Sequence, residues 1–201
     1  HGCPLFKGRR PAHDAHCVAA LRSAGAVVLG KTVTTELATL TPARTKNPAS
    51  LTHSPGGSSA GSAAAVADAM VPAAIGTQTA GSVIRPASYC GVVGFKPTFG
   101  LISRCGALPQ SHTLDTIGVF ARSIEDVALL TDCMSAFDPD DPASYQRSQP
   151  RLLEMARDMA PLPPLFVFIK TPAWDDAEPV MQPAFEELLA RVRALVRRRY
   201  G

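Results

Sequence analysis

Two short segments combine serine with glycine and alanine in a pattern that suits nucleophilic catalysis. They are Ser54–Ser62 (SPGGSSAGS) and Gly76–Ser82 (GTQTAGS). Small side chains let the backbone approach a bound ligand closely and turn several N–H groups toward one point. A serine nucleophile needs such converging donors, because negative charge develops on the carbonyl oxygen that it attacks. It also needs a proton acceptor, since a free serine hydroxyl is a weak nucleophile.

Three other interpretations of these segments are possible. A Gly/Ser stretch on its own is often a flexible loop. A phosphate cradle would require GxxxxGK[ST], and Gly30-Lys31-Thr32 lacks the upstream glycine at that spacing. The stretch Gly57–Gly61 satisfies GxSxG with Ser59 as nucleophile, but it follows a long polar loop instead of a strand, and His112 is the only histidine after it.

The elements around these segments predict an α/β protein, because helices, glycines, strands and loops succeed one another. Asp14 is expected to begin a helix that reaches Leu21 and is ended by Gly25, and Ser123 is expected to cap another, with Asp126 completing a capping box. The remaining expected elements are a short buried strand at 26–29, a loop at 41–59, a helix at 60–70, strands at 71–77, 91–95, 117–120 and 165–169, and helices at 124–134 and 183–198.

Taken together, the motifs resemble the amidase-signature family. The residues that carry the resemblance are Pro55–Ala67, Gly76–Ser82, Pro86-Ala87, Cys90–Thr98 and Gly100, with Asp14-Ala15 and Leu21–Thr32 upstream and Leu114–Gly118 and Ser123–Asp126 downstream. The resemblance is strong over residues 1–135 and weak over the remainder.

The resemblance implies a Ser–Ser–Lys triad. Ser82 would be the nucleophile, and Ser58, on a cis peptide bond 24 residues upstream, would relay its proton. Backbone N–H groups of Thr79, Ala80, Gly81 and Ser82 would form the oxyanion hole. Further residues expected to bind substrate or support the loops are Gly57, Ser59 and Gln78. The lysine must be neutral to accept a proton, which burial favours.

The chain departs from the family pattern at several positions. The motif that carries the catalytic lysine is not among these residues, and Lys31 matches a Gly-Lys-Thr segment that does not hold the catalytic position. Gln78 stands where aspartate is common, Ala60 and Ala80 replace common glycines, and Arg85 falls three residues after Ser82 instead of two.

Composition, cysteine spacing and net charge indicate which classes of protein and which partners can be set aside. Of 201 residues, 46% are hydrophobic and 18% charged, which is typical of a globular domain and not of a disordered chain. Five cysteines without CxxC spacing indicate neither a disulfide framework nor a zinc site, so a reducing cytoplasm is expected. The net charge of +3, without interleaved aromatics, predicts no nucleic-acid surface, and the absence of a long apolar run predicts no membrane partner.

These observations lead to one set of expectations. The fold is expected to be α/β, a mixed twisted β-sheet covered by helices, truncated at both ends; the start at His1 favours a piece of something longer. Residues 1–201 would form one partial amidase domain, with a signature core at 1–135, a connector at 136–150 and the start of a C-terminal part at 151–201.

The expected activity is hydrolysis of a carboxamide C–N bond through an acyl-enzyme on Ser82, using a lysine outside the chain and no metal or organic cofactor. The partner would be a small-molecule amide, and a homo-oligomer is possible. Alternatives are the amidase subunit of a tRNA-dependent amidotransferase and a catalytically inactive fragment.

Overall fold

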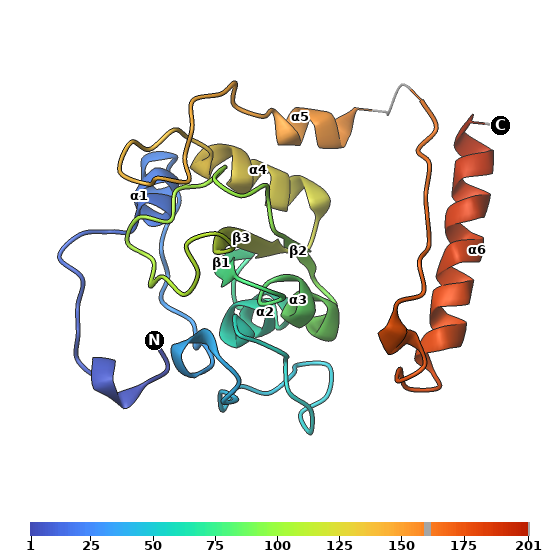
Figure 1. The fold of residues 1–201 in the computed structure, drawn as a ribbon, viewed down its shortest axis with the longest axis horizontal. Coiled ribbons are helices and arrows are strands. Elements are labelled where there is room, and N and C mark those ends of the chain that lie inside the picture. The colour runs from blue at the N-terminus through green and yellow to red at the C-terminus, as the bar shows by residue number, and fades with distance from the viewer. Residues whose placement is uncertain (159–161, 201) are drawn as a thin grey trace. The chain divides into compact units, whose positions relative to one another are not determined.

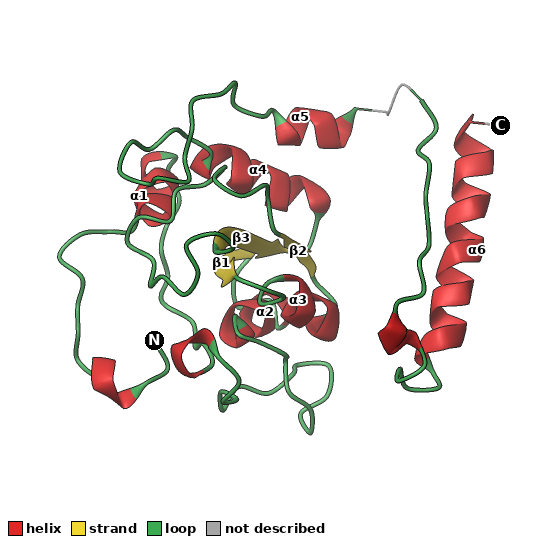
Figure 2. Cartoon of the chain, viewed as in Figure 1, coloured by secondary structure: helices red, strands yellow, loops and turns green. Residues whose placement is uncertain are grey.

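The computed structural model describes residues 1–158 and 162–200, which separate into two compact units, His1–Arg157 and Asp158–Gly201 (Figure 1). The α-helices and strands of the first unit are α1 (His16–Ser23), α2 (Ala60–Ala67), β1 (Ala73–Gln78), α3 (Ile84–Cys90), β2 (Val93–Phe95), β3 (Thr116–Ala121), α4 (Ile124–Met134) and α5 (Leu152–Arg157). The second unit contains α6 (Met181–Tyr200). Figure 2 shows that long loops connect many of these elements. The expected α/β architecture is confirmed.

A small three-stranded sheet lies at the centre of the first unit. Its order is β1-β3-β2, and β3 pairs antiparallel with both neighbours, so the sheet, expected to be mixed, consists of antiparallel pairs in the described residues. Gly76 lies opposite Gly118, and Gln78 lies opposite Thr116. Every residue of β3 is buried, because β3 is the middle strand and both of its faces are covered. The sequence prediction for 117–120 is therefore confirmed.

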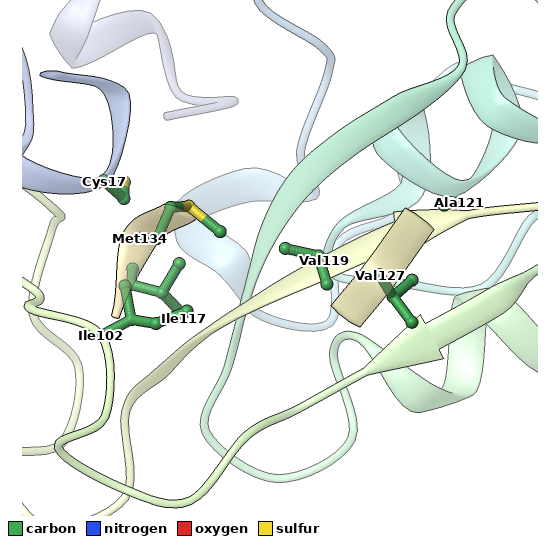
Figure 3. Packing of buried hydrophobic residues seen from close by; sticks show 7 residues of the cluster. All are labelled: Cys17, Ile102, Ile117, Val119, Ala121, Val127 and Met134. Carbon is green, nitrogen blue, oxygen red and sulfur yellow. The ribbon is translucent and has the colours of Figure 1, made fainter. Parts of the chain in front are cut away.

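One face of the sheet is covered by α1 and α4 (Figure 1). Alternate residues of β3 point to this side, as the two-residue period of a strand requires. The residues that form the core here are Cys17, Ile102, Ile117, Val119, Ala121, Val127 and Met134 (Figure 3). The buried residues of α4 recur at helical spacing and end with Met134, which has no exposed surface. This pattern made α4 predictable from the sequence.

The opposite face packs unusually close to α2 and α3, and its strands need glycine there. A Cβ added to Gly94 would lie 2.5 Å from the Cβ of Ala87, and one added to Gly118 would lie 2.9 Å from a Val83 methyl group. Such distances are shorter than any ordinary van der Waals contact. The small residues of α2 serve the same close approach, and Phe120 is the large, fully buried side chain of this layer.

Two helix starts show how far local sequence predicts structure. The Ser123 hydroxyl accepts a hydrogen bond from the Asp126 N–H at 3.1 Å, which confirms the predicted cap of α4. The reciprocal bond from the Ser123 N–H to the Asp126 carboxylate is not formed in the described residues, so the predicted capping box is only half present. Asp14 does not cap α1: Ala15 occupies the N-cap position, and the Asp14 carboxylate instead accepts from Arg22 at 3.1 Å on the exposed surface. An exposed arginine eight residues along the chain thus competes with the helix end for this carboxylate.

The helix α3 was not expected from the sequence. It contains Pro86 in its first turn, where the missing N–H removes no helical hydrogen bond.

The short helix α5 was also not expected from the sequence. It begins where Leu152 and Leu153 donate their N–H groups, both at 2.9 Å, to the Asp132 carboxylate of α4. Its N-terminal partner is therefore distant in sequence.

Two expected strands are not formed. Residues 26–29 and 165–169 have no strand partner in the described part of the chain. Val27 is 81% exposed and Leu165 is 92% exposed, so the prediction of a buried strand at 26–29 is wrong for this structure. Apolar β-branched composition favours a strand only when a neighbouring strand and a covering layer are supplied.

The second unit is built around α6, which confirms the helix expected at 183–198 and extends it at both ends. Phe168, Trp174 and Phe185 form a small aromatic cluster with ring centroids 5.4–5.9 Å apart. Lys170 places its ammonium 5.0 Å from the centre of the Trp174 ring. None of the described helices is long and apolar enough to cross a lipid bilayer.

Candidate active site

The paired-serine loop is held firmly around Ser58. The peptide bond between Gly57 and Ser58 is cis, as the resemblance implies. The Gly57 carbonyl accepts two hydrogen bonds from the Arg85 guanidinium, at 3.1 and 2.9 Å. The Ser58 carbonyl accepts from the Thr35 N–H and from the Thr34 hydroxyl, each at 3.0 Å. Both carbonyls that flank the Ser58 side chain are therefore fixed, one by α3 and one by the segment before the loop.

The second serine-bearing loop leaves β1 at Gln78 and reaches α3 through Ser82, as expected for a segment that follows a strand. The buried Gln78 side chain organises this loop. Its amide oxygen accepts the N–H groups of Val83 and Ile84 at 2.8 and 3.0 Å, and its amide nitrogen donates to the Ala80 carbonyl at 2.9 Å. An aspartate would have no donor for the Ala80 carbonyl. Glutamine is thus a suitable residue for this position.

The turn held by Gln78 leaves several backbone donors available. The N–H groups of Thr79, Ala80, Gly81 and Ser82 donate no hydrogen bond to another described residue. The two serine loops meet at this point, because the Ser59 N–H donates to the Ser82 carbonyl at 3.3 Å. Unbonded N–H groups beside a serine are the donors that an oxyanion requires.

The hydroxyl groups of the serines divide into two classes. Ser59 Oγ exchanges hydrogen bonds with the backbone of Thr77 at 3.3 Å, and Ser62 Oγ bonds to the Ile75 carbonyl at 2.8 Å. By contrast, the hydroxyls of Ser58 and Ser82 form no hydrogen bond to any other described residue. Ser59 is therefore tied to β1, which argues against the GxSxG interpretation.

A carboxylate supports the start of the same loop. The Thr79 hydroxyl donates to Asp115 Oδ1 at 2.5 Å, and Gln110 Oε1 lies 3.3 Å from that hydroxyl. The other oxygen, Asp115 Oδ2, accepts the N–H groups of Gln110 and Ser111 at 2.6 and 2.8 Å. Burial raises the pKa of Asp115, but these hydrogen bonds outweigh burial and hold the pKa below its usual value. The carboxylate therefore stays ionised and can accept all three bonds.

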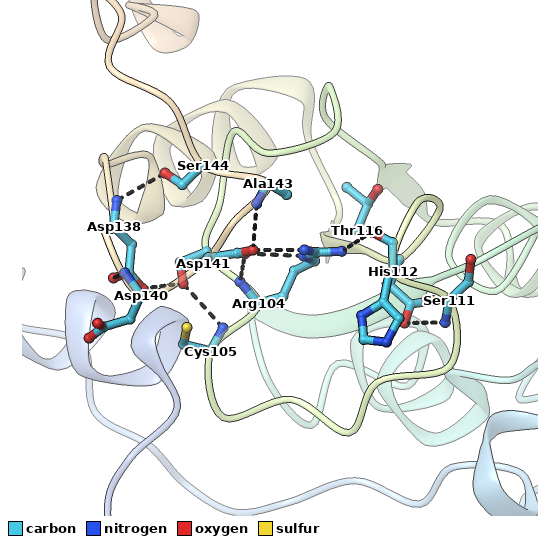
Figure 4. A network of polar contacts seen from close by, with 12 residues as sticks. Arg104, Cys105, Ser111, His112, Thr116, Asp138, Asp140, Asp141, Ala143 and Ser144 are labelled. Carbon is cyan, nitrogen blue, oxygen red and sulfur yellow. Dashed lines mark hydrogen bonds and ion pairs between the residues drawn. The ribbon is translucent and has the colours of Figure 1, made fainter.

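A second polar network braces the segment that carries Asp115 (Figure 4). Arg104 forms a two-pronged ion pair with the buried Asp141, with bonds of 2.7 and 3.1 Å, and also donates to the His112 carbonyl at 2.9 Å. The hydrogen bonds from Arg104 hold the pKa of Asp141 well below its usual range. The same bonds to Asp141 raise the pKa of Arg104. The Ser103 hydroxyl donates to Asp138 in the same network. The connector around 138–144 is thereby fastened to the loop before β3.

In the described residues, neither Lys31 nor Lys96 forms a hydrogen bond to Ser58. Lys31 is exposed and forms no hydrogen bond to another described residue, while Lys96 donates to the Pro97 carbonyl at 2.7 Å. The neighbours of Lys31 serve packing: the Thr32 hydroxyl lies 2.7 Å from that of Ser62, and the Val33 carbonyl accepts from Gly61 at 2.8 Å. Nothing in this geometry gives Lys31 the role of a base, in keeping with the expectation that its Gly-Lys-Thr segment does not hold the catalytic position.

Sequence reasoning gave no role to Arg85 or Asp115. Arg85 stood out only for its unusual spacing from Ser82, and Asp115 only as part of a downstream motif. One signal was present for Asp115, since it directly precedes β3. The register that sets Gln78 opposite Thr116 brings Thr79 and Asp115 to the same end of the strand pair.

Comparisons with known proteins agree with this geometry. The amidase family model matches residues 1–197. The chain is 42% identical, over 96% of its length, to a glutamyl-tRNA(Gln) amidotransferase subunit of Thermus thermophilus, and covers 42% of that protein. Two crystal structures are similar, each with a TM-score of 0.70. The peptide amidase of Stenotrophomonas maltophilia is 40% identical, with 75% of this chain and 33% of that one covered. The corresponding amidotransferase subunit of Thermotoga maritima is 41% identical, with 73% and 34% covered.

The chain therefore belongs to the amidase family. It spans less than half the length of the relatives that it matches.

Proposed function

We propose that this chain carries the nucleophile and oxyanion hole of an enzyme that hydrolyses a carboxamide C–N bond. The observation that carries the proposal is the loop at 79–82. It combines backbone N–H groups that have no partner in the described residues with a serine hydroxyl that is likewise unengaged. Family membership supports the same chemistry.

In the proposed reaction, Ser82 Oγ attacks the amide carbonyl carbon. Its proton passes to Ser58, whose own proton passes to a neutral lysine that is not among these residues. The N–H groups of Thr79, Ala80, Gly81 and Ser82 stabilise the resulting oxyanion. Collapse of the tetrahedral intermediate breaks the C–N bond, and the leaving amine takes a proton back along the same route. Water then hydrolyses the ester on Ser82 and releases the carboxylic acid.

Three observations support Ser58 as the proton relay. Its hydroxyl is unengaged, whereas that of the adjacent Ser59 is bound to Thr77. Its backbone is fixed on both sides, so the hydroxyl has a defined place from which to exchange protons. Because Ser58 is only 2% exposed, water competes little for that exchange.

A serine-directed fluorophosphonate tests this proposal. It would be applied to residues 1–201 and to a version extended upstream with the lysine segment, and the adduct would be mapped by mass spectrometry. We expect labelling at Ser82 in the extended form, and no labelling after Ser82→Ala. Lys31→Met is the matched control, and we expect it to label like the parent. Failure to label Ser82 in a folded extended form would instead support an inactive fragment.

A second function is favoured by the named relatives, two of which are amidotransferase subunits. In that case the ammonia released at Ser82 would pass to a second protein chain instead of to solvent. The coding region beside this one should then encode that partner. Copurification of the two chains, with ammonia released only in the presence of the partner's substrate, would distinguish this function from simple hydrolysis.

A further inference from the structure

We infer that Asp115 is a positioning residue for the oxyanion hole, acting through the side chain of Thr79; this inference rests on the proposed function. Thr79 is the first residue of the loop whose N–H groups are left without partners. Its hydroxyl donates to Asp115 Oδ1 at 2.5 Å. A charged acceptor makes such a bond stronger than one between neutral groups.

The strand register explains why these two residues meet. The pairing of β1 with β3 ends at Gln78 and Thr116. Thr79 and Asp115 are the next residue on each side, so the two chains emerge from the sheet together. Beyond the last strand pair, the hydrogen bond from the Thr79 hydroxyl to the Asp115 carboxylate keeps the two chain segments together. It prevents the loop at 79–82 from moving away from β3 while Gln78 holds its other end.

Asp115 is itself held in place. Its second oxygen accepts the N–H groups of Gln110 and Ser111, and the Gln110 amide donates to the Leu37 carbonyl. The segment that contains these residues is braced by Arg104 through the His112 carbonyl. A rigid support of this kind matters because an oxyanion hole works only when its donors already point to the developing charge.

The alternative is that the Thr79–Asp115 bond only stabilises the fold. The two roles differ in what they change. A purely structural bond would alter stability while leaving the turnover of folded enzyme intact. A positioning bond alters kcat while substrate binding, and hence KM, changes little, because the misplaced donors contact the oxygen most strongly in the transition state.

The test compares variants in the catalytically complete protein, which contains these residues and the lysine segment. Thr79→Val removes the hydroxyl at constant shape, Thr79→Ser restores a donor, and Asp115→Asn removes the charge. Removing one oxyanion donor outright lowers kcat by about 100- to 1000-fold. We expect a displaced donor to lower kcat less than a missing one does. The expected reduction in kcat is about 10- to 100-fold in Thr79→Val and in Asp115→Asn, with KM changed by less than about threefold.

Three comparisons make the result specific. Thr79→Ser should recover most of the rate lost in Thr79→Val. The double variant Thr79→Val/Asp115→Asn should be no slower than the slower single variant, because both changes act on the oxyanion hole through the contact between Thr79 and Asp115. Ser123→Ala, which weakens the cap of α4 away from the two serine loops, should lower the melting temperature without lowering kcat.

The outcomes separate this inference from the proposed function. If the parent protein neither hydrolyses amides nor labels at Ser82, the proposed function fails. If the parent is active and folded Thr79→Val turns over within twofold of it, the function stands and the positioning role is wrong. Fully multiplicative effects in the double variant would also overturn the inference.

Discussion

The close contact between Gly76 and the paired-serine loop gives a sharp prediction for Gly76→Ala. A Cβ at this position would lie 2.6 Å from Ser59 Oγ and 2.7 Å from Phe120 Cε2. Carbon atoms pack best at about 3.5–4.0 Å, so these neighbours would have to move by roughly 1 Å. Phe120 is fully buried, and Ser59 is buried against β1, so neither can rotate into solvent.

The magnitude follows from two contributions. Overpacking of a buried site costs about 1–3 kcal/mol. Displacing Ser59 also weakens its hydrogen bonds to Thr77, and a bond of that kind contributes about 1 kcal/mol. We therefore expect Gly76→Ala to lower the free energy of unfolding by about 2–4 kcal/mol, a large part of the roughly 5–15 kcal/mol typical of a domain.

Urea denaturation followed by circular dichroism measures this change, and Gly30→Ala is the matched control. Gly30 has no atom within 4 Å of an added Cβ and does not adopt a left-handed backbone. Both variants restrict the unfolded chain equally, so their difference isolates the clash in the folded state. If the two variants unfold at the same urea concentration, the packing argument for this face of the sheet is refuted.

Three further predictions concern stability. Ser123→Ala should cost about 1 kcal/mol in urea denaturation by removing the 3.1 Å bond to the Asp126 N–H, and an unchanged midpoint would contradict the cap. Phe120→Ala should cost about 3–5 kcal/mol in the same assay, because the side chain is fully buried, and a loss under 1 kcal/mol would contradict its place in the core. Because the pKa of Asp141 is held below its usual value in the folded state, its contribution is fully present above the unfolded pKa of about 3.9 and is lost as the pH falls through the folded pKa. Asp141→Asn should therefore unfold more easily at pH 7 but lose less stability than the parent below about pH 4 in acid titration, and parallel titration curves would contradict this.

The sequence alone determined the elements whose cause is local. The helix α4 was predictable because Ser123 caps it and its apolar residues recur at helical spacing. The strand β3 was predictable from its continuous apolar run between loops. The two serine loops were recognisable because small residues, glycines and serines occur together in each.

The sequence alone did not determine the elements that depend on residues far away in the chain. Residues 26–29 and 165–169 have strand-like composition, but no described segment pairs with them, and pairing is what makes such residues a strand. The start of α5 depends on Asp132, 20 residues before Leu152. No local pattern contains that information.

In the candidate site, too, some features could be predicted from the sequence and others only from the tertiary structure. Residue types indicated serine chemistry, and the family resemblance assigned Ser58 and Ser82. Only the tertiary structure separated the unengaged Ser58 hydroxyl from that of its neighbour Ser59, which is bound to Thr77. Chemically identical side chains can be distinguished only by what surrounds them.

The supports of the site were likewise decided by the tertiary structure. Arg85 reaches the Gly57 carbonyl from 28 residues away, and Thr79 reaches Asp115 across 36. These bonds exist because strand pairing and helix packing bring the segments together, and hydrogen bonds act only at about 3 Å. The sequence therefore indicated which groups could perform the proposed chemistry, and the packing around the sheet decided which of their side chains form hydrogen bonds to the rest of the fold and which do not.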